Sequence, residues 1–165
     1  MIFALVGGTL TLRHSTPAGA RPEPTAGVTP QPSAYALRTI PAAYLRLYWR
    51  AAREYGLDWT RLAAVGRIES DHGRSSEAGV RKGTNRAGAV GPAQFLAHTW
   101  ARYGVDADGR GKMDPYDPAD AVTAMAAYLK ASGAPEDWHA ALYTYNHSQA
   151  YVRAVLALSV RFSGR

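Results

Sequence analysis

From residue 41 onward, apolar residues recur at intervals of three and four, and glycine or proline interrupts the pattern between segments. This spacing places side chains on one face of an α-helix, whereas a half-buried strand would alternate apolar and polar residues. In the first such segment, Tyr44, Leu45 and Tyr48 follow the helical spacing between Pro41 and Gly56. No convincing run of β alternation occurs, so the sequence predicts a mainly α fold.

We expect about six helices, separated by two long glycine-rich loops at residues 70–90 and 104–116. Loops of this length inside a compact domain usually carry function. The fourth helix has the sharpest start, with Asp117 as N-cap, Pro118 as its first residue and Asp120 in its first turn. The expected helices cover residues 41–55, 58–69, 91–103, 117–132, 135–145 and 148–160. In the third of these, Phe95, Leu96 and Trp100 are predicted to point inward.

The first 37 residues have a different character from the rest of the chain. Residues 1–12 form a short apolar run that resembles the core of an export signal, and Ala18-Gly19-Ala20 resembles a cleavage site. Residues 15–37 hold five of the ten prolines and predict an extended, disordered linker. We therefore expect a leader and linker over residues 1–37, a folded domain over residues 38–165, and export to the wall, the periplasm or the medium.

Composition narrows the function classes. The 165 residues include no cysteine, which excludes disulfides, thiolate metal sites and a cysteine nucleophile. The net charge of +6 favours anionic partners such as an acidic wall polymer, a membrane surface or nucleic acid. A DNA-binding domain is disfavoured, because the basic residues are scattered instead of lying on one recognition helix. The five histidines show no zinc-binding spacing.

Glu69 stands out in the second expected helix. It falls on the same face as Trp59, Leu62 and Val65, where an unpaired carboxylate is costly to bury. A partly buried carboxyl group has a raised pKa, which suits a general acid in glycosidic-bond cleavage. The alternative is a glutamate at a frayed helix end that reaches into solvent.

The order of motifs favours the first interpretation. Glu69-Ser70 is followed by Gly91-Pro92-x-Gln94-Phe95, then by Asp117-Pro118-x-Asp120, and finally by Tyr145-Asn146. In this order and spacing, residues 40–162 resemble the lytic transglycosylases of the lysozyme-like superfamily. The strongest resemblance is to the membrane-bound lytic transglycosylase B group. It implies a lysozyme-like helical domain.

The resemblance also implies roles for individual residues. Glu69 occupies the position of the catalytic acid/base, and Ser70 is expected to hold the backbone of the active site. The remaining substrate-binding candidates are Gly91, Gln94, Phe95, Tyr145 and Asn146. Structural roles stay open for several of them: Gly91-Pro92 is a sound helix start, Tyr145 suits a core, and Asn146 suits a helix C-cap.

The implied reaction cleaves the β-1,4 bond between MurNAc and GlcNAc and leaves a 1,6-anhydro-MurNAc end. The C6 hydroxyl of the same sugar is the nucleophile, so one acid/base suffices. A hydrolytic muramidase would need a second carboxylate. Its candidates are Asp71, Glu77, Asp106, Asp108 and Asp114. A non-catalytic wall-binding module is a further alternative.

Residues 106–120 resemble the opening of a calcium-binding EF-hand loop, with Asp106, Asp108 and Asp120 as weak ligand candidates. A similar loop in the resembled group can bind calcium. Arg110 stands where a third acidic ligand is expected, and a guanidinium opposes a cation. We therefore expect a metal-free turn tied by an Arg110–carboxylate contact, no cofactor, and a monomer that binds glycan strands. The leader could add attachment to a membrane or the wall.

Overall fold

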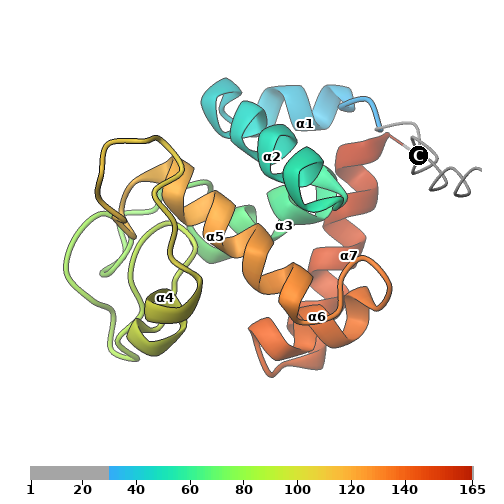
Figure 1. Ribbon diagram of the computed structural model, residues 1–165. Coiled ribbons are helices and arrows are strands. Elements are labelled where there is room, and N and C mark those ends of the chain that lie inside the picture. Colours follow the sequence, from blue (N-terminus) through green and yellow to red (C-terminus); the bar gives the residue numbers. More distant parts are fainter. Residues whose placement is uncertain (1–29, 165) are drawn as a thin grey trace, which may run out of the picture.

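The computed structural model describes residues 30–164 (Figure 1), and this part of the chain is helical, as predicted. Seven helices form within it, and its only β pairing is an isolated bridge between Val90 and Phe95. The helices are α1 (Ala34–Thr39), α2 (Ala42–Tyr55), α3 (Trp59–Ser70), α4 (Ala97–Tyr103), α5 (Pro118–Ala131), α6 (Trp138–Tyr145) and α7 (Gln149–Ser163).

Helix α1 corrects the predicted domain boundary. The linker prediction ran to residue 37, but Ser33 caps α1 by accepting a hydrogen bond from the Ala36 amide. The Ser33 hydroxyl also donates to the carbonyl of Arg161, and the ring of Tyr35 stacks on Phe162. A six-residue helix is too short to show a period in sequence, and its stability comes from contact with α7. The predicted leader lies outside the described residues.

Helices α3 and α5 form the centre of the core. Five consecutive residues of α3 (62–66) and six consecutive residues of α5 (121–126) are buried, so each helix is covered on most of its circumference. Helix α3 packs against α7 and α2, while α5 packs against α2 and α6. Many of the facing residues are alanine or glycine, which allows close approach of the helices. At Gly66, a Cβ atom would overlap the hydroxyl of Tyr48.

Helix starts with a capping residue are predicted correctly. Asp58 accepts a hydrogen bond from the Thr60 amide, Asp117 accepts from Ala119 and Asp120, and Ser148 caps α7. These caps work through local hydrogen bonds that sequence reveals.

The predicted starts of two other helices are wrong. Helix α4 begins at Ala97 and not at Gly91-Pro92, because Gln94 adopts a left-handed φ of 51° within the bridged turn. Leu96 then precedes the helix and is 40% exposed, not inward. Helix α6 begins at Trp138, since Asp137 caps it by accepting from the Ala140 amide.

The two long loops lie against each other at one end of the helical body (Figure 1). The Tyr116 hydroxyl donates to the Gly83 carbonyl across 2.6 Å. Gly91 has a φ of 73°, and a Cβ atom there would overlap the carbonyl oxygen of Pro115. Glycine is therefore required at this contact by both conformation and space.

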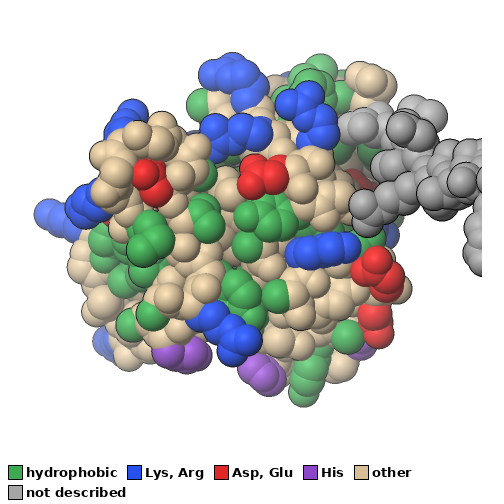
Figure 2. All heavy atoms as spheres, in the orientation of Figure 1, with side chains coloured by type: hydrophobic (Ala, Val, Ile, Leu, Met, Phe, Trp, Pro, Cys, Tyr) green, Lys and Arg blue, Asp and Glu red, His purple; other side chains and the backbone are tan. Residues whose placement is uncertain are grey.

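Basic side chains gather on the visible face over α1 and α2 (Figure 2). Arg46, Arg50 and Arg53 lie exposed along α2. Within residues 30–164, no helix is long and apolar enough to cross a membrane.

Candidate active site

Glu69 lies in the last turn of α3, partly buried, beside a surface hollow of about 360 Å³. The hydroxyl of Tyr151, from α7, donates a hydrogen bond of 2.6 Å to Oε1 of Glu69. The walls of the hollow come from the end of α3 and the loop that follows it: Arg67, Ile68, Glu69, Ser70, Asp71, Ser75 and Glu77. The carboxyl group therefore has one oxygen held by protein, and it lines a space open to a ligand.

Burial raises the pKa of Glu69 to about 7, although the hydrogen bond from Tyr151 opposes the rise. Desolvation disfavours the carboxylate, while a donor to it favours the charged form. A group with this pKa can give a proton and take one back near neutral pH. This agrees with the expectation of a raised pKa for a carboxyl group on an apolar helix face.

Tyr151 is a site residue that the sequence analysis missed. It is 8% exposed, and burial together with Glu69 raises its pKa far above that of free tyrosine, so it remains a donor. Its ring lies parallel to that of Tyr145, with centroids 6.4 Å apart. In sequence, Tyr151 is one more apolar residue on the inner face of α7, and only the tertiary contact reveals its partner.

Ser70 ties the end of α3 to the loop that carries Gly91 and Gln94. Its hydroxyl donates to the Pro92 carbonyl over 2.6 Å and accepts from the Gly73 amide over 2.9 Å. The side chain is 2% exposed, and both of its hydrogen bonds go to backbone. A contact between Ser70 and substrate stays a prediction.

Tyr145 connects the same loop to α6. Its hydroxyl donates to the Ala93 carbonyl across 2.6 Å, and its ring lies half-buried between Phe95 and Tyr151. Asn146 follows as an exposed C-cap of α6. Both positions therefore carry the structural roles that the sequence left open.

Gln94 and Phe95 differ in what they offer to a ligand. The Gln94 amide accepts from Asn85 and donates to the Gly91 carbonyl, so its polar atoms are engaged within the loop. Phe95 is 3% exposed and packs against Trp100 and Tyr128. As placed, the ring of Phe95 packs into the core and does not line the hollow, so a contact with substrate stays a prediction for this residue.

The turn after Ser70 is left-handed at Asp71 and His72, with φ values of 51° and 55°. His72 is buried, with its Nδ1 atom 2.9 Å from the hydroxyl of Tyr48. Burial, helped by the charges of Arg74 and Arg67, lowers the pKa of His72 to about 3, so the ring is neutral. His72 is therefore a packing residue behind the site and not a solvated loop histidine.

Two candidate second carboxylates share the hollow with Glu69. Asp71 forms ion pairs with Arg67 and Arg74, which occupy its carboxylate. Glu77 is exposed, and it forms no ion pair with another described residue. The other candidates, Asp106, Asp108 and Asp114, do not line this hollow.

The acidic residues of the second loop form a cluster, with one oxygen each from Asp106, Asp108 and Asp120 within 4.8 Å of one another. Backbone amides already donate hydrogen bonds to these carboxylates. Both oxygens of Asp106 accept from the amides of residues 110 and 111, and those of Asp120 accept from residues 107 and 114.

The guanidinium of Arg110 lies 3.1 Å from Asp108 and 3.4 Å from Asp117. The predicted Arg110–carboxylate contact is therefore present. A guanidinium held in this way opposes a divalent cation, so a metal-free turn stays our prediction for these residues.

Comparisons with known proteins show what this chain is similar to. Residues 79–140 match the family described as Transglycosylase SLT domain. A stretch of 47 residues is 43% identical to membrane-bound lytic murein transglycosylase B of Escherichia coli. That stretch is 28% of this chain and only 13% of the relative, so the chain spans a small part of the relative's length. Over these residues the chain is similar to the lytic transglycosylases.

Solved transglycosylase structures share its fold. SltB3 of Pseudomonas aeruginosa, in complex with NAG-NAM-pentapeptide, superposes with a TM-score of 0.66 at 21% identity, covering 79% of this chain and 63% of that one. Slt35 of Escherichia coli, in complex with calcium, gives 0.60 at 17% identity, with coverage of 77% and 76%. The lysozyme-like fold expected for this transglycosylase relative is confirmed.

Glu69 lies outside the segment that matches the SLT domain, which begins at residue 79. Gly91, Gln94 and Phe95 lie inside it. The role of Glu69 in this transglycosylase relative therefore rests on its geometry and on the motif order.

Proposed function

We propose that this chain cleaves the β-1,4 bond between MurNAc and GlcNAc in peptidoglycan and leaves 1,6-anhydro-MurNAc ends. The observation that carries the proposal is Glu69, a partly buried carboxyl group with a pKa of about 7 on the wall of an open hollow. The relatives named above support the substrate class, because SltB3 has been solved with a glycan-peptide fragment of the wall.

In the first step, protonated Glu69 gives its proton to the glycosidic oxygen as the bond from C1 to that oxygen breaks. Oε1 is held by Tyr151, which leaves Oε2 to reach the substrate. The hydrogen bond from Tyr151 then stabilises the carboxylate that forms.

In the second step, the carboxylate of Glu69 takes the proton of the C6 hydroxyl while that oxygen bonds to C1 of the same sugar. One bond to C1 is broken and one is formed, the proton moves from the C6 hydroxyl to the leaving oxygen, and no water is consumed. Because the nucleophile belongs to the substrate, its effective concentration is high.

We infer that Ser70 and Tyr145 act by holding the loop at residues 92 and 93, next to the hollow. Gln94 and Asn146 stay proposed substrate contacts. Asn146 is free to reach a sugar, whereas Gln94 would have to exchange a loop hydrogen bond for one to the ligand.

Hydrolysis is the second candidate, and one observation favours it: Glu77 lines the same hollow as Glu69 and could activate water. Mass spectrometry of wall sacculi after digestion separates the two reactions. Anhydro-muropeptides support the transglycosylase, and reducing ends support the hydrolase. Equal wall clearance by the wild type and Glu69→Gln would instead establish a non-catalytic wall-binding module.

We further propose that the protein is exported and acts on the wall as a monomer. The named relatives support this place of action, since one of them is called membrane-bound and acts on murein. Secretion of the full chain, followed by sequencing of its mature N-terminus, would test export and leader cleavage together.

A further inference from the structure

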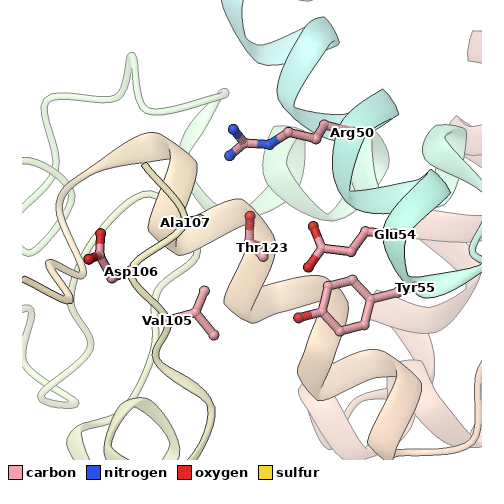
Figure 3. Close-up of a pocket in the computed structure, with 7 residues that line it drawn as sticks. All are labelled: Arg50, Glu54, Tyr55, Val105, Asp106, Ala107 and Thr123. Atoms are coloured by element: carbon pink, nitrogen blue, oxygen red, sulfur yellow. The ribbon is translucent and has the colours of Figure 1, made fainter. Parts of the chain in front are cut away.

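A second hollow, separate from Glu69, lies between α2 and the segment after α4 (Figure 3). Its volume is about 280 Å³, enough for a group of amino-acid size. Arg50, Glu54 and Tyr55 of α2 form one wall, residues 105–107 form the other, and Thr123 of α5 lies at the floor.

The polar groups of this hollow converge on its interior. Figure 3 shows the guanidinium of Arg50 and the carboxylate of Glu54 extending from α2 toward it, with the Thr123 hydroxyl pointing up between them. Burial, together with the charge of Glu54, raises the pKa of Tyr55, so the phenol keeps its proton.

None of these four groups has a polar partner within the part of the chain that the structure describes. Arg50 and Glu54 are one helical turn apart, yet they form no ion pair. The hydroxyls of Tyr55 and Thr123 are absent from the tyrosine and threonine hydroxyl bonds of the described residues. Thr123 is 4% exposed and lines the hollow, so its hydroxyl is available to a ligand there. Other acidic groups of the fold, such as Asp58 and Asp71, do pair with arginine.

The charges disfavour a ligand with a single charge. A simple anion would meet the carboxylate of Glu54, and a simple cation would meet the guanidinium of Arg50. A group with both charges on one carbon satisfies both walls, with its carboxylate at Arg50 and its ammonium at Glu54. The hydroxyls of Tyr55 and Thr123 can then complete its hydrogen bonds.

We propose that this hollow binds a dipolar amino-acid centre, a carbon that bears both a free ammonium and a free carboxylate. The source is the unlinked end of a diamino acid in a peptidoglycan stem peptide, and this choice of source rests on the proposed function. The hollow thus binds the peptide part of the wall, at a place distinct from the carboxyl group of Glu69 that is proposed to cleave the glycan.

Titration followed by amide NMR tests the chemistry without any cleavage. Alanine carries both charges, alaninamide lacks the carboxylate, and N-acetylalanine lacks the ammonium. We expect alanine alone to give saturating shifts at residues 105–107 and 123, with a dissociation constant on the order of 1 mM. Equal binding by either blocked analogue, or no saturation with alanine, would overturn the proposal.

Variants locate the site. Arg50→Gln and Glu54→Gln should each weaken alanine binding at least about tenfold, because each removes one of two charged contacts. Arg46→Gln removes another exposed arginine of the same helix that does not line the hollow, and it should bind like the wild type. All three changes are at exposed positions, and the same spectra report whether the fold is intact. Unchanged binding by Arg50→Gln would contradict the assignment.

A further NMR titration identifies the source of the ligand. A muropeptide with a free diamino-acid end should shift the same amides in a Glu69→Gln background at a lower concentration than alanine does. Binding of alanine but not of the muropeptide would overturn the stem peptide as the source. Both results are independent of whether sacculi are cleaved, so this inference and the proposed function can fail separately.

Discussion

The hydroxyl of Tyr151 and Oε1 of Glu69 lie 2.6 Å apart, joined across 82 positions of sequence. The hydrogen bond favours the carboxylate, so it limits the rise in the pKa of Glu69 that burial causes. Tyr151→Phe should therefore raise this pKa above its present value of about 7. If protonated Glu69 is the acid, the alkaline limb of the pH–activity profile moves to higher pH.

The same variant should lower kcat by about tenfold, because the carboxylate formed during the reaction loses its donor. A pH profile of sacculus digestion measures both effects. Tyr143→Phe, which removes the hydroxyl of an exposed tyrosine on α6, is the matched control. A Tyr151→Phe profile that keeps the wild-type alkaline limb would contradict the pairing.

Glu69→Gln should abolish cleavage and alter the pH dependence of stability. The pKa of Glu69 in the folded state, about 7, lies above the ordinary glutamate value of 4.5, so the folded state holds the proton more tightly. The associated stability is present in full below pH 4.5 and is lost as the pH rises through 7.

We therefore expect Glu69→Gln to be more stable than the wild type at pH 8, by about 1–3 kcal/mol after allowance for partial exposure. The excess should shrink as the pH falls toward 4.5. Denaturant unfolding at several pH values provides the measurement. A gap between the two proteins that does not vary with pH would show that Glu69 titrates like an exposed glutamate.

Ser70→Ala should destabilise the fold by about 1–3 kcal/mol, because it leaves the buried Pro92 carbonyl without its donor. Ser159→Ala is the matched control, since this buried serine donates only to the Leu156 carbonyl within its own helix. Urea unfolding of the two variants should show the larger loss for Ser70. Activity should fall with Ser70→Ala even where the protein is fully folded, since the loop beside the hollow loses an anchor.

Calcium should leave the melting temperature of the wild type nearly unchanged, because Arg110 supplies the positive charge in the acidic loop. Arg110→Asn removes this charge and adds an oxygen ligand, so millimolar calcium should then raise the melting temperature. Thermal melts with calcium and with magnesium check both statements. A rise of several degrees in the wild type would contradict the first statement, because calcium would then bind in spite of the guanidinium of Arg110.

Local signals explain what could be predicted from sequence. Asp58, Asp117 and Ser148 cap their helices through their own neighbours, and each start is correct. Glu69 is anomalous on its own helix, so its raised pKa is within reach of the same reasoning. The contacts of Phe95 and Tyr151 could not be predicted in this way, because neither a motif nor a periodicity indicates which tertiary neighbour a side chain contacts. Helix α1 is missed since its stability comes from contact with α7.

Two consecutive carbonyl groups, those of Pro92 and Ala93, are held by Ser70 from α3 and by Tyr145 from α6. A segment fixed from two helices at adjacent peptide units has little freedom to swing as a lid. The glycan strand would therefore meet a surface already in its working shape, and little binding energy would go into ordering the protein. A long polymer can bind such a preformed surface at any point along its length, since no closing motion has to wrap around it.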